Sequence, residues 1–401
     1  MKILVLNSGS SSLKFELFNK VDLSVLASGM IENIGDTKSA ARLSFVDSSG
    51  AEQASEQSVS IADHRGAITV MDEMLQESRA LVDMDELAGI GHRVVHGGEA
   101  FHEPVQIDDT VIKAIKDLIP LAPLHNPANL MGIQVSMEHA ANIPQVAVFD
   151  TAFHQSIPEH AYLYALPYDL YEKQKVRRYG FHGTSHSYVA RQAARYLGRP
   201  LEDLNIVTLH LGNGASAAAI RGGKCIDTSM GMTPLEGLVM GTRSGDLDPA
   251  ILFYLGRESG MDMETLDTLL NKKSGLKGIC GENDMRRISK AAENGDHQAN
   301  LALTMFCYRL KKYIGAYMAA LGGTDCIVFT GGIGENSATI RQQSCHGLEG
   351  LGVTLDAEKN NIRQKETMEI QASDSRVKLL VIPTDEEYEI ASQTLKVIDN
   401  A

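Results

Sequence analysis

The sequence predicts an α/β protein with central sheets, built from two related domains. Apolar runs that end in glycine-rich or polar turns alternate with segments of helical periodicity, and this alternation is typical of α/β folds. The stretch "ILVLNSGSSSLKFEL" (3–17) also resembles "IVTLHLGNGASAAAI" (206–220), because each consists of an apolar run, a turn of small residues and a second run. A repeat of this kind predicts two domains that face each other across a cleft.

The length and composition agree with this organisation. A chain of 401 residues has enough core for two domains, and 43% hydrophobic with 22% charged residues is typical of a soluble globular protein. The net charge of −14 argues against a nucleic-acid or anionic-membrane surface. The five cysteines are scattered and form no CxxC pair, which predicts neither a disulfide framework nor a structural zinc site. With no apolar run long enough for a bilayer and no leader pattern, we expect a cytoplasmic protein.

The first repeat predicts a strand at Ile3 to Leu6, a turn at Asn7 to Ser11 and a strand at Ser12 to Phe18. A P-loop is excluded because the stretch has a single glycine and its lysine is followed by Phe15. Small residues at the tip allow backbone N–H groups to approach an anion. An ordinary hairpin with a polar turn explains the stretch equally well. Residues 30 to 60 predict an edge hairpin without an assigned function.

Two later segments place charged side chains where strands end. "GHRVVHGGE" (91–99) carries His92 and His96, a metal pair if helical, but the valines and glycines favour a strand that runs into a turn. Locally hydrogen-bonded histidines are therefore the preferred interpretation. Arg93 suits bidentate binding of a carboxylate or phosphate, or a structural ion pair. Asp150 follows the strand "QVAVF", a frequent position for metal or acid–base duty, although a helix N-cap fits nearly as well.

Further candidates lie in loops and at helix starts. "PLHNPANL" (123–130) places His125 in a turn between prolines. "RRYGFHGTSHSYVA" (177–190) contains His182, but without a GxSxG motif Ser185 is better explained as the cap of a helix that begins at His186. Arg243 lies in a loop of glycine and serine, in reach of an anion.

The remaining motifs suit nucleotide phosphates and a helix start. "HLGNGAS" (210–216) and "TGGIGENS" (330–337) are glycine-rich turns after apolar strands, and the second precedes a predicted helix. "PTDEEYEIA" (383–391) places Glu386 at a helix start, where Thr384 and Glu387 also fit a capping box. Cationic loop residues, oxygen ligands and glycine-rich turns are together the set that phosphoryl transfer requires.

In order and along nearly the whole chain, these segments resemble the acetate kinase family: "VLNSGSSSLKF", "GHRVVHGGE", "PLHNPANL", "FDTAFH", "RRYGFHGTSH", "LHLGNGAS", "GMTPLEGLVMGTRSGDLDP", "FTGGIGENS" and "VIPTDEE". The resemblance implies an α/β fold of two duplicated ribonuclease H-like/actin-like domains that face a nucleotide cleft. Residues 1–151, closed by a C-terminal helix at about 387–401, would form one domain. Residues 152–386 would form the other, with nucleotide binding and a dimer interface. The first hairpin would be the first phosphate loop of that superfamily.

The same resemblance implies reversible transfer of the γ-phosphoryl group of ATP to acetate, giving ADP and acetyl phosphate, with Mg²⁺ (or Mn²⁺) as cofactor. It also implies a homodimer, a place in acetyl-CoA biosynthesis, and neither nucleic-acid nor membrane partners. Asp385 departs from the family, which often has Asn there, and so adds charge beside the metal ligands. The implied roles are: catalytic, Asp150, His182, Arg243, Arg93 and His125; acyl binding, Arg93, Val95, Leu124, Phe181 and Pro234; nucleotide binding, Lys14, Ser10, Ser12, His210, Leu211, Gly212, Asn213, Gly214, Asp284, Met285, Arg286, Gly331, Gly332, Ile333, Gly334, Glu335 and Asn336; metal binding, Asn7 and Glu386.

A carboxylic acid with a pKa of about 4 to 5 is ionised at neutral pH and needs no general base. We therefore expect direct in-line transfer in which Asp150 positions metal and charge, although the family often assigns it proton transfer. Propionate kinase is the nearest alternative, and Val95 favours the smaller acid by only about 1 to 3 kcal/mol per methylene. A non-catalytic actin- or Hsc70-like nucleotide switch is the alternative from another class, but it would not require Arg93, His182 and Arg243 together.

Overall fold

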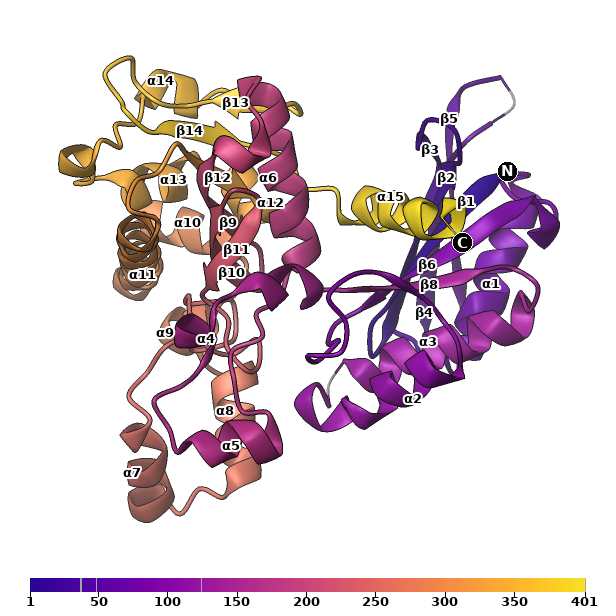
Figure 1. Cartoon of the computed structure of the whole chain (residues 1–401), viewed down its shortest axis with the longest axis horizontal. Helices are drawn as coiled ribbons and strands as arrows, with labels where there is room; N and C mark the ends of the chain where they lie inside the picture. Colours follow the sequence, from indigo (N-terminus) through magenta and orange to yellow (C-terminus); the bar gives the residue numbers. More distant parts are fainter. Residues whose placement is uncertain (37, 48, 124, 401) are drawn as a thin grey trace. The chain divides into compact units, whose positions relative to one another are not determined.

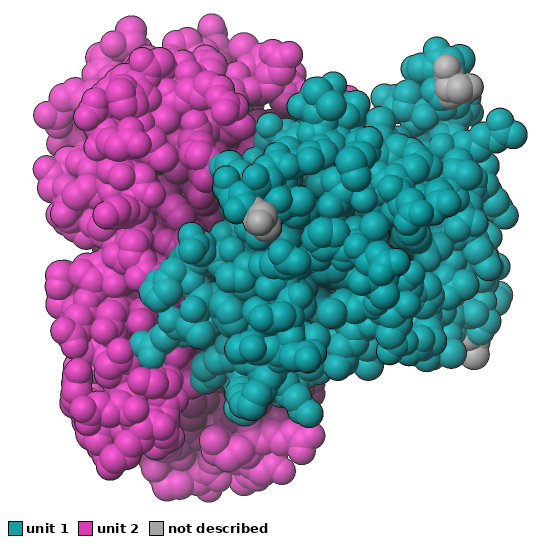
Figure 2. All heavy atoms as spheres, turned by 45° about the vertical axis from the view of Figure 1, so that its right-hand side comes forward, with its two compact units in different colours: residues 1–152, 385–401 teal, residues 153–384 magenta. Residues whose placement is uncertain are grey.

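The structure of the protein is a computed structural model that describes residues 1–36, 38–47, 49–123 and 125–400. The chain forms two compact units, drawn in teal and magenta in Figure 2: residues 1–152 and 385–401 form unit 1, and residues 153–384 form unit 2. The sequence-based ranges assign Glu386 to the second domain. In the structure it begins the last helix of unit 1.

Unit 1 contains an 8-stranded sheet. Its elements, labelled as in Figure 1, are β1 (Lys2–Ser8), β2 (Ser12–Asn19), β3 (Val25–Glu32), β4 (Ser39–Val46), β5 (Glu52–Val59), α1 (His64–Glu77), η1 (Met84–Glu86), β6 (Leu87–Val94), β7 (Val105–Gln106), α2 (Asp109–Asp117), η2 (Ile119–Leu121), α3 (Asn126–His139), β8 (Gln145–Phe149) and α15 (Glu386–Asp399). The predicted first hairpin and the predicted edge hairpin, β4–β5, are both present.

Unit 2 contains a 6-stranded sheet. Its elements are α4 (Glu159–Tyr162), α5 (Tyr168–Gln174), α6 (Gly183–Leu197), η4 (Leu201–Asp203), β9 (Asn205–Leu211), β10 (Ala215–Arg221), β11 (Lys224–Thr228), α7 (Ala250–Ser259), α8 (Met263–Lys272), α9 (Gly275–Cys280), α10 (Met285–Glu293), α11 (His297–Leu321), β12 (Cys326–Thr330), α12 (Gly331–Asn336), α13 (Ala338–Cys345), η5 (Glu349–Leu351), α14 (Ala357–Asn360), β13 (Met368–Glu369) and β14 (Lys378–Val381). A further 3₁₀ turn, η3 (Ala152–Ser156), spans the boundary between the units.

The two sheets repeat one strand order. In unit 1 the order is β5-β4-β3-β2-β1-β6-β8-β7, and in unit 2 it is β11-β10-β9-β12-β14-β13. In the first sheet β1 pairs antiparallel with β2 and parallel with β6, and β6 pairs parallel with β8. In the second sheet β9, β10, β12 and β14 pair in the same way. The repeated sequence motif therefore marks a repeated sheet.

Side chains of β1 alternate between the two faces of the sheet, as the period of a strand dictates. Leu4 and Leu6 belong to a buried cluster with residues of α1 and α3, whereas Ile3 and Val5 pack with Ile390 of α15. Helices α1 and α3 thus cover one face of the unit 1 sheet, and α15 covers the other.

Helix α15 approaches β6 closely because the residues of β6 that face the helix include two glycines. A Cβ atom on Gly89 would lie 2.0 Å from Cδ1 of Ile398, and one on Gly91 would lie 2.3 Å from Oγ1 of Thr394. A larger residue at either position would push the helix away from the strand. This packing fixes α15, with the acidic residues of its first turn, on the strand that carries Arg93.

The core of unit 2 follows the same principle. Val189 and Ala193 of α6 pack against Ile206 of β9 and Val328 of β12, and α11 packs on β9 and β10. Within the described ranges, no helix combines the length and apolar character that a membrane span requires.

Candidate active site

In unit 1, parallel strands bring predicted residues to one edge of the sheet. Asn7 lies near the end of β1, Arg93 near the end of β6, and Asp150 directly after β8. Arg93 donates from Nε to Oδ1 of Asp150 (3.1 Å), from Nη2 to Oδ2 of Asp150 (2.5 Å) and from Nη1 to Oδ1 of Asn7 (3.3 Å). Oε2 of Glu386 lies 3.9 Å from Nε of Arg93. We call these residues the Arg93 cluster.

The Arg93 cluster is a nearly enclosed arrangement of one cation and several oxygen atoms. The Asp150 side chain is 1% exposed and that of Arg93 is 19% exposed. Burial alone would lower the pKa of Arg93, but the Asp150 and Glu386 carboxylates outweigh it and raise that pKa. The helix cap suggested for Asp150 is wrong, because the 3₁₀ turn that follows, η3, begins at Ala152 and is preceded by Thr151. Amide and carboxylate oxygens of Asn7 and Glu386, with Asp150 beside them, are hard ligands that fit Mg²⁺.

The first hairpin holds Lys14 opposite Asn7 in the strand register. Nζ of Lys14 lies 2.7 Å from Oε1 of Glu387 and 3.7 Å from Oε1 of Glu16. The predicted phosphate-binding lysine is therefore engaged by the first turn of α15. Ser10 is exposed at the tip of the turn, where the amide of Gly9 donates to the carbonyl of Ser12 (2.8 Å).

The start of α15 differs from the suggested capping box. Asp385 is the N-cap, and its carboxylate accepts from the amide of Tyr388 (2.8 Å). Thr384 lies outside the helix, and Glu387 is paired with Lys14. Asp is a favoured N-cap residue, and because the helix begins at Glu386, Glu387 does not stand at the third helical position that a capping box requires. The residue that departs from the family pattern is thus the one that caps this helix.

Sequence reasoning missed a pair of buried amides on α3. Asn129 is 4% exposed; its Nδ2 donates to the carbonyl of Ser8 (2.8 Å), and its Oδ1 accepts from the amide of Val95 (3.0 Å). Asn126 accepts from the amide of His96 and donates to its carbonyl. A single side chain, Asn129, thus connects the first phosphate turn to the end of β6. The only signal in the sequence was a pair of amides three residues apart on an otherwise apolar helix face.

Two histidines of unit 1, His92 and His96, form hydrogen bonds with the surrounding structure. Nε2 of His92 lies 2.7 Å from Oε1 of Gln145, and Nδ1 of His96 accepts from the amide of Gly98 (3.0 Å). The contact of His96 confirms the prediction of a local hydrogen bond. For His92 that prediction is wrong, because its partner Gln145 lies on the neighbouring strand β8, remote in sequence. His125 is the N-cap residue of α3.

The predicted acyl pocket is divided between the units. Val95 is buried in unit 1 and Phe181 is buried in unit 2. Pro234 lies in the unit 2 loop that leads to Arg243, and Leu124 lies outside the described residues. The pocket therefore stays a prediction.

In unit 2, His182 and His210 stack on each other. Their ring centroids are 4.3 Å apart, with 14° between the planes. His182 adopts a left-handed backbone conformation (φ 57°) at the N-cap of α6, a conformation uncommon outside glycine and often found at functional sites. His210 is the last but one residue of β9, and its Nδ1 lies 2.8 Å from Oγ of Ser185.

Ser185 is not the helix cap that the sequence suggested. Helix α6 begins at Gly183, so Ser185 lies within its first turn. Its Oγ contacts Nδ1 of His210 and lies 2.7 Å from Oγ1 of Thr384. Ser185 therefore connects the end of β9 to the segment that follows β14.

Arg243 and His182 converge on the backbone of the first glycine-rich turn. A Cβ atom on Gly214 would lie 3.3 Å from Nε2 of His182 and 3.5 Å from Nη1 of Arg243. Nη1 of Arg243 donates to the carbonyl of Pro234 (3.1 Å), and burial lowers the pKa of Arg243. Within the described part of the chain, no carboxylate forms an ion pair with this guanidinium. A half-buried cation of this kind is suited to an anionic ligand.

A cavity of about 980 Å³ lies beside this turn in unit 2, large enough for a nucleotide. It is lined by the predicted residues Gly212, Asn213, Asp284, Met285, Arg286, Gly332, Ile333, Glu335 and Asn336, and by others that sequence reasoning missed, among them Asn283, Asn361, Ile362 and Arg363. Of these four, Asn283 precedes α10 and the other three follow α14, and none belongs to a motif. The side chain of Arg286 pairs with Asp284 (2.6 Å) and is 90% exposed.

The second glycine-rich turn is itself a short helix, α12, and the helix predicted to follow it is α13. Gly331 has a φ of 76°, and a Cβ atom there would lie 2.8 Å from the carbonyl oxygen of Leu211. Oε1 of Glu335 accepts from the amides of Gly331 (2.9 Å) and Thr384 (3.1 Å). Glu335 therefore braces the turn as well as lining the cavity.

Comparison with known proteins gives matches along nearly the whole chain. The model of the acetokinase family matches residues 2–392. The chain is 56% identical over 402 residues to the acetate kinase of Syntrophobacter fumaroxidans, covering 100% of this chain and 98% of that protein. It superposes on the crystal structure of Porphyromonas gingivalis acetate kinase with a TM-score of 0.92 and 46% identity, and on that of a propionate kinase from Francisella tularensis with 0.93 and 42%, each over 99% of both chains. The two sheets of common strand order are thus the duplicated actin-like, ribonuclease H-like domains, and the chain belongs to the acetokinase family.

Proposed function

We propose that the protein is a phosphotransferase that moves the γ-phosphoryl group of ATP reversibly to acetate, giving ADP and acetyl phosphate. The observation that carries this proposal is the match to acetate kinases along the full chain, at 56% identity to the first of them. The nucleotide-sized cavity of unit 2 and the carboxylate-binding guanidinium of unit 1 support it.

In this proposal Arg93 binds the acid, since its guanidinium already holds a carboxylate, that of Asp150, in a bidentate manner. An aspartate engaged in this way is a poor proton acceptor. The acid, with a pKa of about 4 to 5, is already ionised at neutral pH. We therefore assign Asp150 the role of orienting Arg93 and the charge near the metal, and the carboxylate attacks phosphorus directly and in line.

His182 and Arg243 would stabilise the charge that develops on the transferring phosphoryl group, because both converge on Gly214 and Arg243 has no competing ion pair among the described residues. Asn7 and Glu386 would hold Mg²⁺, for which Mn²⁺ can substitute, and the ion would neutralise charge on the phosphates. The residues from His210 to Gly214, Asp284 to Arg286 and Gly331 to Asn336 would bind the nucleotide. His125 would line the acid site.

The test is formation of acyl phosphate that depends on ATP and Mg²⁺, trapped as hydroxamate, with acetate, propionate and butyrate compared. A higher kcat/KM for acetate is the expected result. A higher value for propionate would identify a propionate kinase, the second candidate, which is retained because the chain is also similar to the propionate kinase of Francisella tularensis. Nucleotide binding without acid-dependent ADP formation would contradict both and support the nucleotide switch.

We also propose a homodimer built through unit 2. Exposed apolar side chains recur on one stripe of α11, at Leu301, Met305 and Tyr308, and on α7, at Phe253 and Tyr254. Single exposed apolar residues are ordinary, but a stripe at helical spacing is typical of an interface. Light scattering after gel filtration should give twice the chain mass, and Tyr308→Glu should reduce it to one chain.

A further inference from the structure

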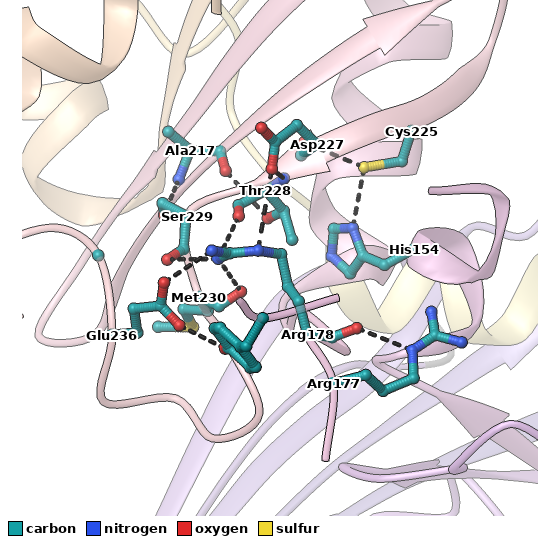
Figure 3. Close-up of polar contacts among 12 residues, drawn as sticks. His154, Arg177, Arg178, Ala217, Cys225, Asp227, Thr228, Ser229, Met230 and Glu236 are labelled. Atoms are coloured by element: carbon teal, nitrogen blue, oxygen red, sulfur yellow. Dashed lines mark hydrogen bonds and ion pairs between the residues drawn. The ribbon is translucent and has the colours of Figure 1, made fainter. Parts of the chain in front are cut away.

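Arg178, whose side chain is 15% exposed, lies at the centre of a polar network in unit 2 (Figure 3). Its Nη1 donates to the carbonyl oxygens of Thr228 (2.8 Å), Ser229 (3.3 Å) and Met230 (3.1 Å). Its Nη2 donates to Oε1 of Glu236 (2.6 Å). A single guanidinium thus holds both ends of the loop from residue 228 to residue 236.

Glu236 is held from a second side by Tyr164. The phenol donates to Oε2 of Glu236 (2.5 Å) and accepts from the amide of Met232 (2.9 Å). The arrangement leaves no room for a side chain at Gly231, because a Cβ atom there would lie 1.9 Å from Oε2 of Glu236 and 2.3 Å from the Tyr164 oxygen. Arg178, Glu236 and Tyr164, which we call the Arg178 clamp, therefore determine the shape of the loop.

The clamp connects the chain segments that carry the proposed transition-state groups. Arg178 lies four residues before His182, and the amides of Tyr179 and Gly180 donate to the carbonyl of Gly231 (3.0 and 3.2 Å). The loop contains Pro234, whose carbonyl accepts from Nη1 of Arg243 (3.1 Å). A displacement of the loop would move the acceptor that orients Arg243 away from its position relative to His182.

We propose that the Arg178 clamp positions Arg243 against His182 for phosphoryl transfer, and that it does so without contacting a substrate. The inference rests on the proposed function, because it takes the transition-state roles of His182 and Arg243 from it. Misplacement of a catalytic group by about 1 Å can cost about 100-fold in rate. A loosened clamp should therefore lower kcat, while the nucleotide cavity, which these three residues do not line, keeps its affinity.

The test uses conservative variants of the full chain. Glu236→Gln removes the charge that Arg178 and Tyr164 share, and Tyr164→Phe removes a single hydroxyl. Tyr162→Phe is the matched control, since the hydroxyl of Tyr162 lies 3.4 Å from that of Tyr171 and, among the described residues, forms no hydrogen bond with the loop. The measurements are kcat, KM for ATP and for acetate, ADP affinity by calorimetry, and the thermal midpoint.

We expect kcat to fall about tenfold or more in Glu236→Gln and roughly three- to tenfold in Tyr164→Phe, with ADP affinity and KM for ATP within about twofold of wild type. Both act through one carboxylate, so the double variant should be no slower than Glu236→Gln. If kcat in both variants equals that of the control, the positioning role is overturned. The same follows if ADP affinity and the thermal midpoint fall together with kcat. If Glu236→Gln does not fold, the kcat of Tyr164→Phe relative to the control decides whether the clamp has a positioning role. A wild-type protein without acid-dependent turnover would overturn the proposed function, and this role with it.

Discussion

Arg243→Met should separate activity from stability. The guanidinium is half-buried, donates to the carbonyl of Pro234, and has no ion-pair partner among the described residues. Its removal sacrifices one hydrogen bond, worth about 1 kcal/mol, and relieves the cost of burying an uncompensated charge. We therefore expect the free energy of unfolding to stay within about 1 kcal/mol of wild type, or to rise by up to about 2 kcal/mol.

The same substitution should nearly abolish turnover. Removal of a single donor to a developing charge typically costs about 100- to 1000-fold in kcat, or about 2.7 to 4 kcal/mol. The hydroxamate assay gives kcat, and urea denaturation followed by circular dichroism gives the free energy of unfolding. A folded protein with ADP affinity near that of wild type and a kcat lowered by that factor is the expected outcome.

Arg93→Met is the matched contrast, because it removes the same side chain from a site where it has a buried partner. Asp150, at 1% exposure, would keep its charge without compensation. Breaking a buried pair in this way costs about 3 to 5 kcal/mol. Arg93→Met should therefore unfold much more easily than Arg243→Met. Equal destabilisation by the two variants would refute the argument that Arg243 is kept for its ligand and Arg93 also for the fold.

Three further predictions concern unit 1. Burial, followed by the charge of Glu387, raises the pKa of Glu16 from 4.5 to about 7, although Lys14 lowers it. Because the folded state then binds this proton more tightly than the unfolded state, the contribution of Glu16 to stability is fully present below pH 4.5 and is lost, by about 3 kcal/mol, as pH rises through 7. Glu16→Gln should remove this dependence in denaturation at pH 5 and pH 8, whereas Glu52→Gln, exposed on β5, should retain it. Asn129→Asp loses the donor to the carbonyl of Ser8, and its free energy of unfolding should fall by about 2 to 4 kcal/mol. The exposed Asn142→Asp is the control, and a fall no larger than in this control would contradict the bridging role. Val95→Ala should raise kcat/KM for propionate relative to acetate by roughly 10-fold, and an unchanged ratio would remove Val95 from the acyl pocket.

Much of the fold was predictable because it depends on local patterns. The alternation in β1 and the apolar runs of β6 and β8 identify strands, and residues directly after such runs must meet at one sheet edge when the strands are parallel. The sequence predicted Asp150 from its position after a strand and Arg93 from the anion-binding chemistry of its side chain, whereas the role of Asn7 came from the family resemblance. It also identified the repeated hairpin, whose strand order the second sheet reproduces.

The partners of individual side chains could not be predicted in this way. A lysine at position 14 could contact either a phosphate or a carboxylate, and the sequence does not distinguish the two. Only the packing of α15 on β6 brings the carboxylate of Glu387 to it. By sequence Ser185 fits a helix cap, but helix α6 begins two residues earlier, and the hydroxyl of Ser185 contacts His210 instead. Asn129 binds backbone atoms of segments remote in sequence, and backbone atoms leave no signature in the sequence.

The duplicated sheets have diverged in charge, and this divergence suggests why the proposed reaction uses both copies. At the strand ends of unit 1, the cation of Arg93 is neutralised by Asp150, and oxygen atoms of Asn7 and Glu386 suit a metal. At those of unit 2, neutral turn residues adjoin His210, and the Arg243 charge has no ion-pair partner within the described ranges. A carboxylate nucleophile and a nucleotide polyphosphate are both anions and repel each other. In the proposed reaction, one copy of the fold would bind the acid with its charge already balanced, and the other would keep its cation for the phosphoryl group that is transferred. Reversing the charge of either set, for example with Arg243→Glu, should abolish transfer while leaving the other set intact.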